Sequence, residues 1–295
     1  MGVLDDLPRG VPGRMNLPPG LPGAKWAEPS TIGNNPVFRF SNEKIFCGMV
    51  NGELIGIKDD RHAMMVAGSR AGKGRAVIIP TLLEYAGSAL VIDPKAELAS
   101  ITARRRGKGG TRGDGARIEG LGQVVAVLDP FGIGAEWLAP YQASFNPMAR
   151  LDPESESIVE DAGAIADAII MRGGEREAHW DESALEFLKG LILHVATSAH
   201  HAERRNLITV HELLVRAEDG EEGQDADLEI EMGGNEAVEG RVQNAAVNYY
   251  NKPDNERGSV LSTAQRNASF LDTPAMKRVL IWLMPWSWRS MTRSV

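Results

Sequence analysis

A short glycine-rich stretch constrains the fold of this 295-residue chain more than any other feature. It follows an apolar, strand-like run at residues 62–67 and precedes a segment with helical spacing at residues 72–85. A strand, a turn of small residues and a helix form the setting in which backbone N–H groups and a lysine hold nucleotide phosphates. The residues of this predicted phosphate loop are Ala67, Gly68, Ser69, Arg70, Ala71, Gly72, Lys73 and Gly74.

The loop departs from the regular Walker A pattern at two positions. Ala67 stands where the first glycine belongs, and Gly74 replaces the Ser or Thr whose hydroxyl binds Mg²⁺. Gly72 still allows close approach of the backbone to a phosphate, and Lys73 would neutralise the β- and γ-phosphate oxygens of ATP. The pattern alone leaves two interpretations open: nucleotide binding, or a glycine-rich turn with an exposed lysine.

Two further apolar runs, residues 88–92 and 123–128, each close in Asp-Pro and flank a helical segment at 96–106. Together with the first run they predict a β-α-β-α-β order, and hence a parallel sheet with right-handed crossovers. Asp93, at the end of the second run, could assist Mg²⁺ through water or could cap a turn or the following helix. We expect a structural role for Asp129 at the end of the third run.

The N-terminal part has two distinct sections. Residues 1–36 hold seven of the sixteen prolines, which predicts an extended leader. Two apolar runs follow, at 44–50 and 53–57, separated by Asn51-Gly52. This dipeptide is the strongest two-residue signal for a β-hairpin.

Beyond Pro147 the hydrophobic spacing becomes helical and predicts an all-α domain. Three capping boxes are expected to start helices. They are Ser157 with Glu160, Ser183 with Glu186, and Thr209 with Glu212. Further helices are expected near 237–250 and 259–270, after an acidic loop at 218–231.

Charge is unevenly distributed along the chain. Residues 150–256 hold 9 Lys or Arg against 25 Asp or Glu, a net charge of −16, and the remainder carries +8. The acidic block should repel DNA and attract basic proteins. The densest basic patch either contacts a phosphate backbone or is a solvated turn after a helix. Its members are Arg104, Arg105, Arg106, Lys108 and Arg112.

Other site classes have little support in the sequence. A single cysteine, Cys47, excludes a disulfide framework and fits a cytoplasmic protein. Adjacent His200 and His201 point to different faces, so the histidines predict no metal site. No serine or cysteine triad stands out, so no catalytic residue is assigned. Apolar runs end well short of 18 residues, and we expect no membrane span in this chain.

Several long motifs, in order, resemble the TraG/VirD conjugative DNA-transfer family of type IV secretion coupling proteins. They are KWA at 25–27, the phosphate loop with IIPTLL after it, DPKAEL at 93–98, FNPM at 145–148, HWDESALEFLKGLILHV at 179–195 and GSVLSTAQRNASFLDTPAM at 258–276. The resemblance implies an α/β fold: a RecA-like P-loop NTPase with a parallel sheet, incomplete here, and an inserted all-α domain.

The same resemblance implies cofactors, partners and location. It implies ATP and Mg²⁺ at Lys73, Gly72, Gly74 and Asp93, with Lys95 at the end of the next strand. It also implies a homo-hexamer at the inner face of the cell membrane. Such a motor moves DNA, or relaxase-type protein cargo with DNA, toward type IV secretion channel proteins, and the all-α domain helps to select them.

The chain also departs from the family pattern at both ends. No transmembrane helices precede the Trp26 segment, and the Walker B Asp-Glu pair expected after the all-α domain is missing. The last fourteen residues do not match, so we expect a truncated or frameshifted end, with an amphipathic tail as the alternative. The expected domains are a leader (1–36), a nucleotide-binding part (37–149), an all-α domain (150–272) and an atypical tail (273–295).

Three functions remain open from the sequence. The first is the nucleotide-binding portion of a DNA-transfer ATPase, although without Walker B we expect no hydrolysis by this chain. The second is a non-catalytic module in which the acidic all-α domain recruits basic cargo and the phosphate loop is vestigial. The third, an unrelated P-loop enzyme such as a small-molecule kinase, does not account for the long motifs.

Overall fold

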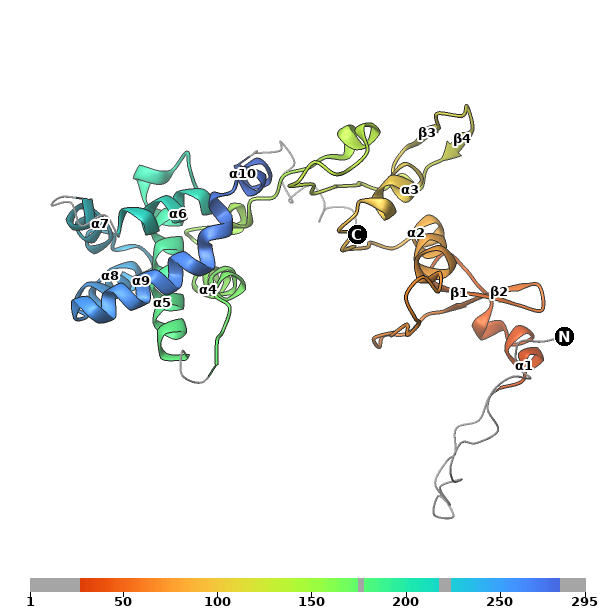
Figure 1. The fold of residues 1–295 in the computed structure, drawn as a ribbon, viewed down its shortest axis with the longest axis horizontal. Helices are drawn as coiled ribbons and strands as arrows, with labels where there is room; N and C mark the ends of the chain where they lie inside the picture. The colour runs from red at the N-terminus through yellow and green to blue at the C-terminus, as the bar shows by residue number, and fades with distance from the viewer. Residues whose placement is uncertain (1–26, 175–177, 218–223, 282–295) are drawn as a thin grey trace, which may run out of the picture. The chain divides into compact units, whose positions relative to one another are not determined.

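The computed structural model describes residues 27–174, 178–217 and 224–281 (Figure 1). These residues form two compact units. Of the described residues, one unit comprises those from Ala27 to Ile92 together with Arg104–Gly122, and the other comprises Asp93–Ala103 and those that follow Gly122. The expected Trp26 anchor and the last fourteen residues lie outside the described residues.

The first unit begins with a short helix and the expected hairpin. Helix α1 (Pro29–Gly33) precedes strands β1 (Ile45–Val50) and β2 (Glu53–Ile57), which pair antiparallel. The turn residues Asn51 and Gly52 have φ values of 52° and 84°. Two successive positive φ values match the twist of the strands, and Asn-Gly adopts them at low cost. The hairpin prediction is confirmed.

The helix expected after the phosphate loop is also confirmed, but its first part is a π-helix and not an α-helix. Its first turns, Gly74–Ile78, are a π-helix, and α2 (Ile79–Glu84) continues as an α-helix. Pro80 has no N–H to donate to the preceding turn, which disfavours regular α-helical winding before it. The backbone N–H of Phe46 donates to the Thr81 hydroxyl at 3.1 Å, so the helix is held against the hairpin.

The remaining part of the first unit is a helix end and a small hairpin. Helix α3 (Glu97–Arg106) agrees with the expected 96–106, and the boundary between the two units falls inside it. Strands β3 (Gly109–Thr111) and β4 (Arg117–Glu119) follow and pair antiparallel.

The expected parallel sheet is not observed. Both sheets of the described residues are two-stranded and antiparallel, and the runs 62–67, 88–92 and 123–128 form no named strand. Their apolar side chains face solvent: Met64 is 88% exposed and Leu90 is 95% exposed. An apolar run specifies where side chains would pack, but a strand forms only when a neighbouring backbone accepts its hydrogen bonds. One isolated parallel bridge, between Val127 and Gln142, is present.

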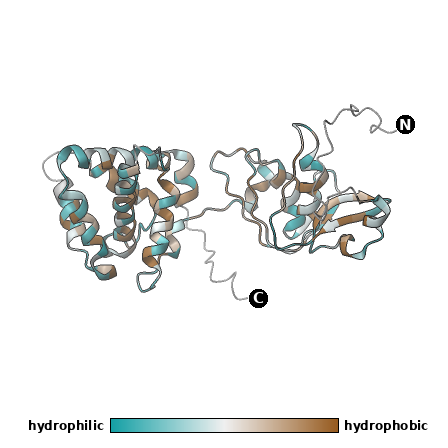
Figure 2. Ribbon diagram, turned by 90° about the horizontal axis from the view of Figure 1, so that it is seen from below, coloured by the Kyte–Doolittle hydropathy of each residue, from teal (hydrophilic) through white to brown (hydrophobic). Residues whose placement is uncertain are grey.

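The second unit has an all-α core, as expected. Its helices are α4 (Ile158–Ile169), α5 (Ala178–Thr197), α6 (Leu207–Arg216), α7 (Gln224–Gly233), α8 (Ala237–Tyr250), α9 (Asp254–Ala268) and α10 (Pro274–Ile281). Helix α5 contacts α4, α6, α8 and α9 (Figure 1). Each helix shows hydrophilic and hydrophobic stretches (Figure 2), as burial of one face requires.

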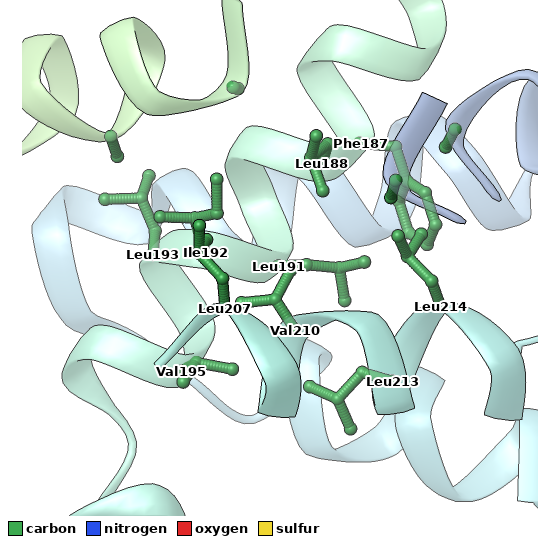
Figure 3. Packing of buried hydrophobic residues seen from close by; sticks show 14 of the residues in the cluster. Phe187, Leu188, Leu191, Ile192, Leu193, Val195, Leu207, Val210, Leu213 and Leu214 are labelled. Atoms are coloured by element: carbon green, nitrogen blue, oxygen red, sulfur yellow. The ribbon is translucent and has the colours of Figure 1, made fainter. Parts of the chain in front are cut away.

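The centre of this core lies along α5. Leu188, Leu191 and Ile192 have no exposed surface, and Val210 and Leu214 of α6 pack toward them (Figure 3). Gly190, on the same helix, faces α8: a Cβ built there would lie only 2.3 Å from the Cβ of Ala245. The glycine therefore permits a close approach of the two helices.

None of the three expected capping boxes forms as predicted. Ser157 occupies the N-cap of α4 but its side chain makes no capping hydrogen bond, and Ser183 lies inside α5. Asn206 caps α6 in place of Thr209, because its side-chain oxygen accepts from the N–H groups of Ile208 and Thr209 at 3.0 and 3.1 Å. The expected acidic loop is helical from residue 224, within α7.

Candidate phosphate-binding site

The phosphate loop follows residues 62–66 as a sharply turned segment. Arg70 and Gly72 have positive φ values, 59° and 81°. The glycine adopts this backbone freely, whereas Arg70 does so at a cost. The Ala71 N–H donates to the Gly68 carbonyl at 3.3 Å and closes the turn. The tight turn expected from the small residues is therefore present, and it leads directly into the helix.

Lys73 is the cation of the loop that stands next to the helix, whereas Arg70 lies in the turn. Lys73 stands at the first helical position, half-buried, and its Nζ donates to the carbonyl oxygens of Ala67 and Gly68 at 2.7 and 2.9 Å. The ammonium group is thus folded back over the loop. A phosphate in the same place would offer charged oxygens, which make stronger hydrogen bonds than neutral carbonyls. The contacts show Lys73 folded onto its own loop, and phosphate binding by this side chain stays a prediction.

Asp93 belongs to the second unit and displays the capping geometry. Its Oδ2 accepts from the backbone N–H of Ala99, in the first turn of α3, at 2.9 Å. A carboxylate at a helix start also interacts favourably with the helix dipole. Of the two roles left open by the sequence, capping is the one with a visible contact, and assistance to Mg²⁺ stays a prediction.

Asp129 has the structural role expected of it. Its two carboxylate oxygens accept from the N–H groups of Ile133 and Gly134 at 3.1 and 2.7 Å. Burial alone would raise the pKa of this carboxyl group, but the backbone N–H groups around it outweigh burial, and the pKa lies below its usual value. The side chain therefore stabilises a turn.

Two arginines of the basic patch are engaged within the first unit. Arg106 is buried and donates to the carbonyl oxygens of Leu82, Tyr85 and Gly87 at 2.8–3.1 Å. Arg105 donates to the carbonyls of Leu83 and Glu119 at 3.1 and 2.9 Å. The carbonyls of Leu82, Leu83 and Tyr85 lie at the C-terminal end of α2, where a helix leaves such groups without partners.

The internal contacts change the interpretation of the patch. Arg105 and Arg106 would have to break them to hold a DNA phosphate. Arg112, from the same patch, pairs with exposed Asp114. Sequence reasoning missed the role of Arg106. The sequence did contain one indication of this role. Arg106 ends the helix that follows α2, and a long cationic side chain there can reach the last carbonyl groups of α2.

Among the described residues, no helix is both long enough and apolar enough to cross a bilayer.

Comparison with known proteins identifies the family. The family described as type IV secretory system conjugative DNA transfer matches residues 24–280, which include the phosphate loop, Asp93 and the helices α4 to α10. The chain belongs to this family. The match covers most of the sequence, so it does not depend on the short loop alone.

Relatives with curated names agree with this assignment. Conjugal transfer protein TraG of Escherichia coli is 29% identical over 222 residues, which cover 74% of this chain and 32% of TraG. Protein VirD4 of Agrobacterium fabrum is 51% identical over 49 residues, 17% of this chain and 7% of VirD4. This family member therefore spans about a third of the length of the TraG protein that it matches.

Proposed function

We propose that this chain is the nucleotide-binding portion of a type IV coupling ATPase, which delivers DNA or protein–DNA substrates to a secretion channel. Membership in the conjugative DNA-transfer family supports the role. The arrangement of Lys73 over the phosphate loop is the observation that carries nucleotide binding. In this proposal the phosphates of ATP replace the carbonyls of Ala67 and Gly68 as partners of the ammonium group.

The proposal is tested by isothermal titration calorimetry of the whole chain with ATP and Mg²⁺. Lys73→Ala removes the charge and should weaken ATP binding at least about tenfold, since hydrogen bonds to charged groups contribute about 1.5–3 kcal/mol. Lys58→Ala is the control, because Lys58 is an exposed cation of the same unit that pairs with Glu43 and not with the loop. Equal affinity of the wild type and Lys73→Ala would refute the assignment.

Mg²⁺ is the second proposed cofactor, and Gly74 allows a specific test. A Cβ built at Gly74 has no atom within 4 Å, so a serine fits there. Gly74→Ser supplies the hydroxyl that ordinary phosphate loops use for Mg²⁺. The variant should bind Mg·ATP more tightly than the wild type and bind ATP in EDTA equally well. An unchanged response to Mg²⁺ would place the metal elsewhere.

We also infer that residues 62–67 and 88–92 pair as parallel strands when nucleotide is bound. Support comes from their exposed apolar side chains, which pairing would allow to pack. Hydrogen exchange of these amides with and without ATP is the test. Protection on addition of ATP supports pairing, and unchanged exchange contradicts it.

The alternative, a cargo-recruitment module with a vestigial loop, keeps its support in the acidic charge of residues 150–256. Both proposals include the same partners, a relaxase-type cargo and the channel proteins. Both also include assembly of the chain as a hexamer. Capture of a basic relaxase by the whole chain, released at high salt and unaffected by Lys73→Ala, would favour this module if ATP binding is absent.

A further inference from the structure

Three chemically active side chains converge inside the all-α unit, far along the chain from the phosphate loop. They are His194 of α5, His201 of the 3-10 turn Ala199–His201, and Glu231 of α7. One side-chain atom of each lies within 4.8 Å of the other two. His194 is 2% exposed and His201 is 5% exposed, so both histidines belong to the interior.

The atoms that face one another have no hydrogen-bond partner. These are Nε2 of His194, Nε2 of His201 and Oε2 of Glu231, each shielded from solvent. The Nε2 of His194 and the Oε2 of Glu231 are 3.8 Å apart, too far for a hydrogen bond. Buried polar atoms are normally paired, and several unpaired ones at a single point call for a ligand between them.

We propose that His194, His201 and Glu231 bind a divalent transition-metal cation of the Zn²⁺ class. Two imidazole nitrogens and a carboxylate oxygen form a ligand set that suits this ion. The ligands of a tetrahedral zinc at about 2.0–2.1 Å lie about 3.3 Å apart. His194 Nε2 and Glu231 Oε2 are 3.8 Å apart and all three ligand atoms lie within 4.8 Å of one another, so the side chains must move closer together to enclose the ion.

The surroundings prepare two of the three ligands. Burial lowers the pKa of His194 to about 4, and the pKa of His201 is also lowered chiefly by burial, so both rings are neutral near pH 7, as a metal requires. Arg216 lies 3.5 Å from Oε1 of Glu231 and orients the carboxylate with Oε2 toward the histidines.

Asn235, which contacts the second ring nitrogen of His194, influences how tightly the site binds a metal ion. The side-chain amide Nδ2 of Asn235 contacts Nδ1 of His194 at 3.2 Å and donates to the Thr197 hydroxyl at 2.9 Å. A histidine that binds metal through Nε2 carries its proton on Nδ1 and needs an acceptor there. Asn235 presents a donor instead, so metal binding must turn this amide away and is weaker than with a carboxylate.

This conflict supplies the discriminating experiment. Asn235→Asp offers the missing acceptor and should tighten Zn²⁺ binding about tenfold or more, since such partners change metal affinity about 10–100-fold. Zn²⁺ binding to the tag-free whole chain is measured by calorimetry after treatment with EDTA. The wild type should bind one Zn²⁺ ion per chain and should melt at a higher temperature when Zn²⁺ is present. With Co²⁺ in place of Zn²⁺, it should show the visible absorption of a four-coordinate site.

Ligand variants and a matched control complete the test. His201→Gln and Glu231→Gln should each weaken binding at least about 100-fold, with circular dichroism to verify folding. His200→Gln removes the exposed neighbour of His201 and should leave affinity unchanged. The proposal is overturned if the wild type shows neither calorimetric binding nor a Co²⁺ spectrum. It is also overturned if His200→Gln weakens binding as strongly as Glu231→Gln, or if Asn235→Asp binds Zn²⁺ no more tightly than the wild type.

Discussion

Replacing Gly190 by alanine tests the close contact between α5 and α8 through the sign of the stability change. In a helix interior, alanine is more favourable than glycine by about 1 kcal/mol. At Gly190 the new Cβ would lie 2.3 Å from the Cβ of Ala245, whereas carbon atoms pack best at about 3.5–4.0 Å. The helices must separate by more than about 1 Å, and overpacking of this kind costs about 1–3 kcal/mol.

The expected net effect of Gly190→Ala is a loss of about 1 kcal/mol, opposite in sign to the helix-propensity effect. Gly163→Ala in α4 is the matched control, because its Cβ would meet Lys189 Cδ at 3.6 Å, an ordinary contact. That variant should gain about 0.5–1 kcal/mol. Urea unfolding of the whole chain, followed by far-UV circular dichroism, measures both values.

A second-site change isolates the contact. Ala245→Gly alone should cost about 1 kcal/mol of helix propensity, but in the Gly190→Ala background it removes the clash. The double variant should therefore match the wild type, a coupling of about 2 kcal/mol between the two sites. The reasoning is refuted if Gly190→Ala stabilises the chain as Gly163→Ala does, or if the two substitutions are additive.

Three further predictions concern single side chains. Arg106→Met should destabilise the first unit by about 3 kcal/mol, because buried carbonyl groups lose a charged donor; Arg112→Met, at an exposed pair, should change unfolding by less than about 0.5 kcal/mol. Leu90→Asp should leave the nucleotide-free chain's stability within about 0.5 kcal/mol, as an exposed site allows, and a large loss would show that residue 90 is buried. Asp129→Ala should cost about 1–2 kcal/mol near pH 7. Because the folded pKa of Asp129 is lowered, its contribution is complete above the usual value of 3.8 and is lost as the pH falls through the folded pKa, so acid titration of the variant should lack this step.

Local signals in the sequence were sufficient for most helices and for the hairpin. Asn51-Gly52 specifies its turn by backbone conformation alone. The helical spacing of residues 237–250 agrees with α8, except that residues 238–240 have positive φ values and break the regular winding. The tight turn before the helix also follows from local residues, since Gly72 adopts a positive φ there, whereas phosphate binding by the loop stays a prediction. Each of these features depends on neighbours within a few residues along the chain.

Features that depend on distant partners were not predictable. The apolar run 88–92 has β-forming residues but no paired backbone in this structure, so propensity alone did not suffice to form the expected strand. The capping-box pattern at Ser183 was wrong because α5 begins at Ala178, before the expected cap. The meeting of His194 with Glu231 required the packing of α7 on the core, and the adjacency of His200 and His201 drew attention to the wrong pair.

The hydrogen bonds that Arg106 donates at the end of α2 connect the helix that follows the phosphate loop to α3. The helical segment from Lys73 to Glu84 is about 17 Å long and starts at the loop. Its far end is fixed by hydrogen bonds from Arg106 to the carbonyls of Leu82, Tyr85 and Gly87. Because this helix is held at its C-terminal end, a displacement of its N-terminal end rotates it. A movement of Lys73 toward a bound phosphate would therefore either rotate the helix about its contact with Arg106 or displace α3 as well.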